Sequence, residues 1–115
     1  MTEADSIDFG GGVFVSRVAT EHFSPDPDVP GKEQDVLYDD TDLSAGMSRI
    51  TTGGEPITWT LPKREVLLVL EGTARIEIED GPTLHLGVGD MATLPSGAAT
   101  TWHVSTPFRE FWVLS

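Results

Sequence analysis

From Leu43 onward the chain is a series of short apolar segments separated by turn signals, and this rhythm limits the fold more than any other feature. Within it, residues 74–79 alternate apolar and charged side chains, which is typical of a half-buried strand. Asp80-Gly81 follows as a hairpin signal. No segment sustains the period of an amphipathic helix. The pattern predicts an all-β, antiparallel sandwich or barrel, with strands at residues 46–51, 58–61, 65–71, 73–79, 83–86, 91–94, 100–104 and 108–114.

Residues 1–42 lack this rhythm. The proline-rich segment 24–31 disfavours both a helix and a central strand, because proline fixes φ and removes a backbone donor. Two short apolar segments, at residues 13–15 and 36–38, are candidate edge strands. A chain of 115 residues has room for one core. We therefore expect an irregular N-terminal arm (1–42) attached to a barrel (43–115), one domain in total.

The charge balance excludes several classes of partner. Nineteen acidic residues against seven Lys and Arg give a net charge of −12, which repels nucleic-acid backbones and anionic membranes. No apolar segment approaches the roughly 20 residues of a membrane span. The N-terminus lacks the pattern of a secretory signal, and the chain has no cysteine. These features predict a cytoplasmic protein that has no nucleic-acid or membrane partner.

Glycines, prolines and one glutamate recur at a specific spacing in the second half. Gly53 to Gly72 reads G-x5-W-x-L-x3-E-x6-G, and Gly89 to Val104 reads G-x5-P-x-G-x2-T-x3-V. This spacing resembles the two motifs of the cupin superfamily, G-x5-H-x-H-x3,4-E-x6-G and G-x5-P-x-G-x2-H-x3-N. The segments EVLLVLEGTARIEIEDG, LGVGDMATLPSGAATTWHV and REFWVL are similar to ethanolamine-utilisation Q-type cupins and to the cupin domains of ureidoglycine aminohydrolases.

The resemblance implies a double-stranded β-helix, the jelly-roll barrel of cupins, with a ligand cavity in its mouth. It also implies a homodimer, across which the proline-rich arm is a candidate for exchange. Trp102 matches a tryptophan common in the subfamily. The lysine and tyrosine often found near the C-terminus are Glu110 and Trp112 here.

Most of the metal ligands of cupins are missing. The three histidine positions hold Trp59, Leu61 and Thr100, and only the glutamate, Glu65, is present. One carboxylate cannot hold a transition metal tightly, since such sites use three or four protein ligands. We therefore predict no metal and no other cofactor.

The histidines elsewhere in the chain leave an atypical divalent metal as the alternative. His103 lies three residues after Thr100, and an odd offset in a regular strand points to the opposite face unless a bulge intervenes. His85 alternates with apolar neighbours and should face solvent. His22 lies in the arm, where the sequence cannot place it.

Strand alternation predicts which side chains line the barrel. If Glu65 faces inward, residues on the same faces of the neighbouring strands give an apolar pocket with tryptophans and carboxylates. That pocket comprises Trp59, Leu61, Glu65, Thr100, Trp102, Glu110 and Trp112. The alternatives are that the tryptophans only fill the core, and that Glu65 is exposed or paired with Lys63, Arg64 or Arg49. Both faces of strand 65–71 are largely apolar, so we expect both to be covered.

These residues favour a small-molecule-binding cupin that holds its ligand in the barrel mouth. A carboxylate beside tryptophan suits an amine or guanidinium, through charge and cation–π attraction. The alternative is a hydrolase, lyase or isomerase of a small amine- or ureide-like metabolite, in which Glu65 is the catalytic acid or base. A further alternative is a non-catalytic regulatory or assembly partner. A cavity containing an ionisable group favours the first two hypotheses, and a filled barrel favours the third.

Overall fold

The computed structural model describes residues 7–51, 53 and 56–115. In these residues every regular element is a β-strand. The strands are β1 (Ile7–Gly10), β2 (Val13–Val15), β3 (Ser24–Pro25), β4 (Glu33–Asp39), β5 (Ser44–Ile50), β6 (Ile57–Thr60), β7 (Glu65–Glu71), β8 (Ala74–Ile78), β9 (Thr83–Leu86), β10 (Met91–Leu94), β11 (Ala99–Val104) and β12 (Phe108–Leu114).

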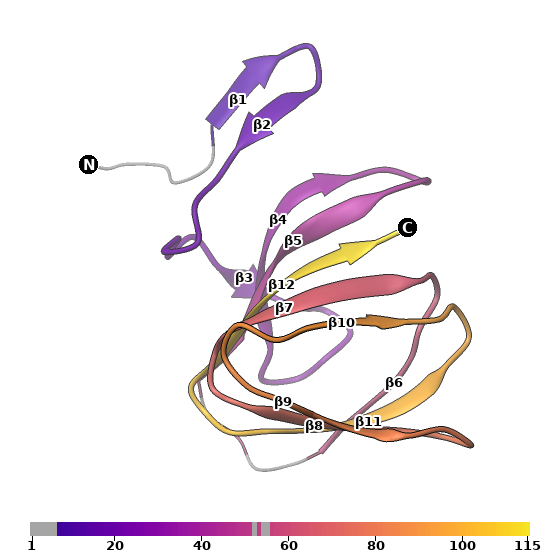
Figure 1. Cartoon of the computed structure of the whole chain (residues 1–115). Coiled ribbons are helices and arrows are strands. Elements are labelled where there is room, and N and C mark those ends of the chain that lie inside the picture. Colours follow the sequence, from indigo (N-terminus) through magenta and orange to yellow (C-terminus); the bar gives the residue numbers. More distant parts are fainter. Residues whose placement is uncertain (1–6, 52, 54–55) are drawn as a thin grey trace.

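Two antiparallel sheets face one another and form the barrel (Figure 1). The larger sheet has six strands in the order β10-β7-β12-β5-β4-β3, and the smaller has four in the order β6-β11-β8-β9. Strands distant in sequence are neighbours in both sheets, as in β7 beside β12 and β8 beside β11. The predicted all-β jelly-roll fold is confirmed.

The core lies between the sheets, where alternate residues of each strand point inward. In β7 the buried positions are Glu65, Leu67 and Val69, and in β8 they are Ala74 and Ile76. Phe108 at the start of β12 is 1% exposed and joins this cluster. The alternation seen in the sequence is therefore the alternation of the barrel wall.

The structure differs from expectation on the outer face of β7. Val66 is 46% exposed, and Leu68 and Leu70 are only half-buried. Nothing else in the described chain covers this apolar row. The sequence pattern correctly predicts that both faces of β7 are apolar. It does not show whether residues of the same chain cover the outer face.

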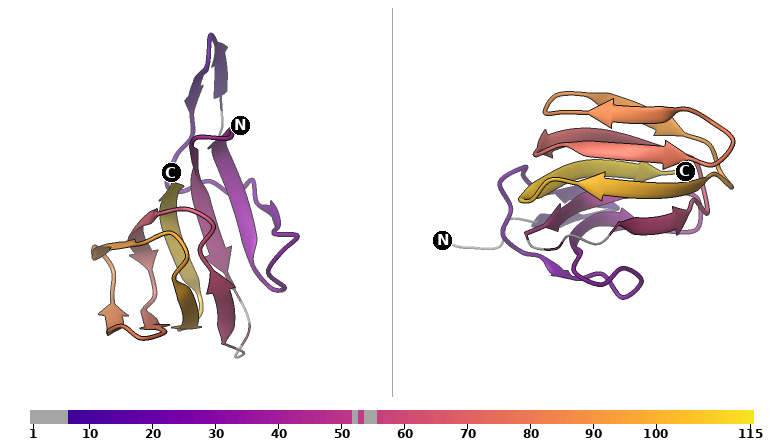
Figure 2. Two further views of the ribbon diagram at one scale, coloured as in Figure 1. Left: turned by 90° about the vertical axis from the view of Figure 1, so that its right-hand side faces the viewer. Right: turned by 90° about the horizontal axis from the view of Figure 1, so that it is seen from below.

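The arm begins with a hairpin, β1–β2, that projects away from the barrel (Figure 2, left). The strand β3 was not predicted, because the proline-rich segment that contains it disfavours a central strand. It is only two residues long and lies at the edge of the larger sheet, where Pro25 is tolerated.

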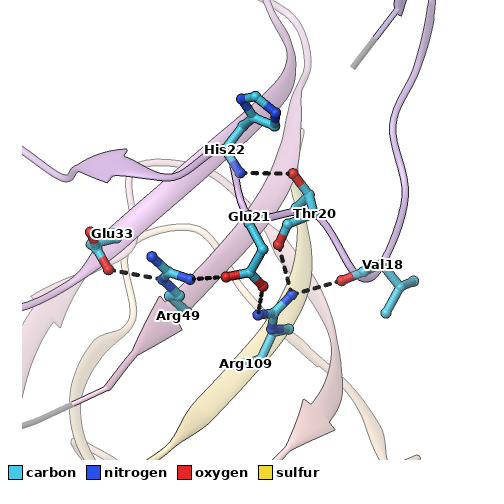
Figure 3. A network of polar contacts seen from close by, with 7 residues as sticks. All are labelled: Val18, Thr20, Glu21, His22, Glu33, Arg49 and Arg109. Atoms are coloured by element: carbon cyan, nitrogen blue, oxygen red, sulfur yellow. Dashed lines mark hydrogen bonds and ion pairs between the residues drawn. The ribbon is translucent and has the colours of Figure 1, made fainter. Parts of the chain in front are cut away.

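Two arginines tie the middle of the arm to the larger sheet (Figure 3). Arg109 of β12 donates to the carbonyls of Val18 and Thr20, at 2.9 and 3.1 Å. Glu21 bridges Arg109 and Arg49 at 3.2 and 3.0 Å. The guanidinium groups of Arg49 and Arg109 lie 4.2 and 5.1 Å, respectively, from the centre of the Phe23 ring. Residues 18–21 are therefore held against the larger sheet, and the chain continues from there toward the barrel mouth.

Among the residues described, no helix is long and apolar enough to cross a membrane.

Candidate ligand-binding site

A cavity opens between the two sheets at the barrel mouth. Six of its residues come from the larger sheet and the β3–β4 loop, and the other three come from the smaller sheet. The space open to water molecules inside it is about 20 Å³, room for one water-sized group. Its lining residues are Val29, Lys32, Ile50, Ile57, Trp59, Glu65, Trp102, Phe108 and Glu110.

Glu65 enters this cavity from the first position of β7. The inward phase of the strand, which also buries Leu67, fixes its direction. Glu65 is 2% exposed, and its Oε1 atom has no hydrogen-bond partner. Burial disfavours the charged form, and the nearby Glu110 adds like-charge repulsion. Together they raise the pKa of Glu65 from 4.5 to about 8.

Glu110 enters from β12, the strand hydrogen-bonded to β7. It is 4% exposed, and its Oε1 atom also lacks a partner. Burial raises the pKa of Glu110 from 4.5 to about 7, with the Lys32 ammonium acting in the opposite direction. Because both carboxyl groups are buried in one cavity and the charge of Glu110 acts on Glu65, near neutral pH the pair retains a proton.

Two tryptophans form the opposite wall. Trp59 lies on β6 and Trp102 on β11, and both line the cavity. Thr100, which occupies the position of a cupin histidine, accepts a hydrogen bond from Trp102 Nε1 at 2.9 Å and donates one to the Trp59 carbonyl at 2.6 Å. The threonine thereby orients an indole ring at the site.

The arm contributes two lining residues that sequence reasoning missed, Val29 and Lys32. Lys32 Nζ lies 5.5 Å from the centroid of the Trp59 ring and 3.7 Å from Asp26 Oδ2. Because the arm has no regular pattern, nothing in the sequence predicts where its loops pack. The only signal is that Lys32 is one of few cations in an acidic chain.

Of the seven predicted pocket residues, four line the cavity: Trp59, Glu65, Trp102 and Glu110. The other three are buried beside it. Leu61 is part of the core, Thr100 holds Trp102, and Trp112 donates from Nε1 to Ser48 Oγ at 2.7 Å.

None of the cations weighed as a partner for Glu65 reaches it. Lys63 donates to the Thr41 carbonyl, Arg64 donates to Thr93 Oγ1, and Arg49 binds Glu33. The alternative of an exposed or ion-paired Glu65 is therefore wrong. The carboxyl is buried in the cavity, with no ion-pair partner among the cations weighed.

The histidines lie elsewhere. His103 faces outward from β11 and its Nε2 contacts Glu77 Oε1 at 2.7 Å. His85 lies on β9 opposite Arg75, on the same outer face, and His22 lies in the arm. Within the described residues no cluster of three or more His, Asp or Glu side chains could hold a metal.

The donor set of the cavity does not fit the metal of other cupins. Only Glu65 and Glu110 offer ligand atoms, and the remaining lining residues are apolar or aromatic, apart from the cation Lys32. Transition-metal sites in proteins normally use three or more ligands, with imidazole prominent among them.

A two-sheet jelly roll with a side-chain-lined cavity at its mouth is the architecture of a cupin barrel, among other jelly-roll proteins. The sequence matches the EutQ-like cupin domain over residues 39–111, and the chain belongs to this family.

Solved structures agree on the fold. A protein described as ethanolamine utilization protein Q from Salmonella typhimurium LT2 has a TM-score of 0.78 at 24% identity, over 95% of this chain and 90% of that one. The EutQ protein of Clostridium difficile has a TM-score of 0.72 at 22% identity, over 96% and 87%. KdgF from a Halomonas species has a TM-score of 0.63 at 16% identity, over 82% and 86%. No curated protein matches the chain.

Proposed function

We propose that this cupin binds a small organic cation, an amine or a guanidinium compound, in the barrel mouth. The observation that carries the proposal is the pair Glu65 and Glu110, two buried carboxyls in one cavity that each have an oxygen without a hydrogen-bond partner. A buried polar group without a partner destabilises the folded state by about 1–3 kcal/mol. Groups of this kind are rare in folded proteins, and a bound cation that pairs with both oxygens would account for them.

The surroundings of the pair suit a cation. The indole faces of Trp59 and Trp102 attract positive charge, by about 0.5–2 kcal/mol per contact. Apolar walls from Ile50, Ile57 and Phe108 suit a short hydrocarbon. The net charge of −12 also raises the local concentration of cations.

Binding should release a proton. A cation stabilises the ionised form of the carboxyl pair and lowers its pKa, so the proton that the free pair retains near neutral pH leaves. The affinity for a cation should therefore rise with pH up to about 8, the pKa of Glu65, and then level off. The charge of Lys32, which faces the pair, does not change this sign.

The test is a calorimetric titration with n-butylammonium chloride at constant ionic strength, with tryptophan fluorescence as a second readout. We expect E110Q and E65Q to bind about tenfold more weakly than wild type, because each loses a carboxylate. The matched control is E77Q, which removes the same charge from the outer face of the smaller sheet and should bind as wild type. Equal affinity in all four proteins, or affinity that falls as pH rises, would refute the proposal.

A second function, acid–base catalysis on a bound amine, is favoured by the raised pKa values of the pair. With values of about 8 for Glu65 and about 7 for Glu110, one protonated and one ionised carboxyl coexist near neutral pH. n-Butylammonium has no bond that an acid–base pair can break, so the test uses glycine methyl ester, which hydrolyses with water to glycine and methanol. At saturating ester, proton NMR should show faster hydrolysis with wild type than with E65Q. Equal hydrolysis rates with the two proteins leave binding as the function.

A further inference from the structure

The loop between β3 and β4, residues 26–32, is held together by hydrogen bonds between its own residues. Asp26 N donates to the Lys32 carbonyl at 2.9 Å, and Lys32 N donates to the Val29 carbonyl at 3.2 Å. Asp28 N donates to Asp26 Oδ1 at 2.8 Å, and Gly31 has φ of 83°. The loop is therefore a compact turn with its own hydrogen bonds. Figure 1 shows it descending from the larger sheet toward the smaller one.

Two side chains of this loop reach the cavity. Val29 is buried, and Lys32 has a side chain that is only 17% exposed. The Lys32 ammonium lies 5.5 Å from the centre of the Trp59 ring, and its charge lowers the pKa of both Glu65 and Glu110. Its ammonium therefore lies at an indole face and within electrostatic range of the carboxyl pair, the two features that would attract an organic cation.

We infer that Lys32 is an internal competitor for the cation site, and that the ligand is a linear primary amine whose ammonium replaces that of Lys32. This inference rests on the function proposed above and names its ligand class. With the lysine in place the cavity has room for one water-sized group, about 20 Å³, which is too small for a whole amine. A ligand therefore enters only when the Lys32 side chain swings out.

The contacts of Lys32 permit this exchange. Its ammonium is not buried in a close ion pair with the glutamates, and its bond to Asp26 is long at 3.7 Å. The backbone bonds that hold the loop together do not involve the ammonium and survive the movement.

The shape of the displaced group determines the ligand class. The lysine side chain occupies the mouth as an unbranched alkyl chain that ends in a primary ammonium. A linear alkylamine reproduces that chain and charge, whereas a quaternary ammonium is wider and cannot donate a hydrogen bond to the free Oε1 atoms of Glu65 and Glu110. The site should therefore prefer n-butylammonium to tetramethylammonium.

The competition is tested with K32M, which keeps the alkyl chain and removes the charge. If the lysine occupies the site about nine-tenths of the time, the apparent affinity of wild type is reduced about tenfold. K32M should then bind n-butylammonium about tenfold more tightly than wild type. K32R, which keeps the charge, should not. The control K63M makes the same change at an exposed lysine bound to the Thr41 carbonyl, and it should behave as wild type.

The outcomes separate this inference from the function on which it rests. If wild type binds n-butylammonium, E110Q weakens it and K32M leaves it unchanged or weaker, the cation site stands and the competition by Lys32 is refuted. A preference for tetramethylammonium in wild type and K32M refutes the ligand class. If neither wild type nor K32M binds any of these cations, the proposed function itself is wrong.

Discussion

At the scale of single residues, the site is dominated by two carboxyl groups that the fold buries without full hydrogen bonding. Glu65 is the one metal-ligand position of the cupin motif that this chain retains. In a metal-binding cupin the ion would neutralise such a carboxylate. Here Glu110 lines the same cavity, and burial together with the charge of Glu110 favours retention of a proton by the pair.

This pair should make the protein less stable as pH rises. In the folded chain the pKa values of Glu65 and Glu110 are about 8 and about 7, above the value of 4.5 expected when unfolded. Between these limits the folded state binds more protons than the unfolded state, so the free energy of unfolding falls with increasing pH. The decline should begin near pH 5 and end near pH 8.

The double variant E65Q/E110Q should lose most of that decline. Near pH 8 it should be more stable than wild type by at least about 1.4 kcal/mol, the equivalent of one pKa unit. Urea denaturation at several pH values measures this difference. Parallel pH profiles for the two proteins would show that the carboxyls are not perturbed.

At the scale of elements, the sequence was informative wherever a strand alternates. The predicted bounds of 65–71, 83–86, 91–94 and 108–114 coincide with β7, β9, β10 and β12. The same alternation brought Glu65 and Glu110 to one face, and placed His103 on the other. It works because a one-residue shift would expose an entire buried row.

Sequence reasoning failed where an element has no period. The β3–β4 loop brings Lys32 to the cavity through long-range packing, with Arg109 and Glu21 holding the arm that precedes it.

The conformation of the predicted hairpin turn was also predicted only in part. Asp80-Gly81 marks the predicted hairpin, but Asp80, with φ of 60°, is the left-handed residue rather than the glycine.

Gly72 and Gly89, two glycines of the motifs that lie in turns, differ in the space available to an added side chain. Gly72 and Gly89 have φ of 79° and 89°, so alanine is strained at both, by roughly 1–2 kcal/mol. At Gly72 an added Cβ would also lie 2.6 Å from the Pro107 carbonyl oxygen, whereas at Gly89 nothing lies within 4 Å. Gly72→Ala should therefore lower the free energy of unfolding by roughly 1–3 kcal/mol more than Gly89→Ala. Equal losses in chemical denaturation would contradict the close contact.

At the scale of the whole molecule, the outer faces of the two sheets differ. The smaller sheet presents polar residues such as Thr101, Glu77 and Arg75, as expected of a solvated face. The larger sheet presents an outer apolar patch, in which cross-strand neighbours continue from β10 through β7 to β12. The patch consists of Val66, Leu68, Met91, Phe111 and Val113, of which Met91 is 75% exposed.

The hairpin β1–β2 adds a second apolar surface. Phe9 is 65% exposed and Val13 is 54% exposed, and an isolated two-stranded hairpin is marginally stable in water. One chain thus carries two apolar surfaces that it leaves uncovered. A second copy supplies both complements at once, since a two-fold axis repeats each contact. We therefore expect a homodimer that packs the outer apolar patch and the hairpin against its partner.

Light scattering coupled to size exclusion should give the mass of a dimer for the wild-type chain. V66D places a charge in the centre of the outer apolar patch and should produce monomers, because the buried carboxylate would have no partner. T101D makes the same addition of charge on the outer face of the smaller sheet and should remain dimeric. Raising the salt concentration should tighten the wild-type dimer, because each chain carries a net charge of −12 and like charges repel across the interface. A monomeric wild type, or a dimer that V66D leaves intact, would mean that the patch meets some other surface.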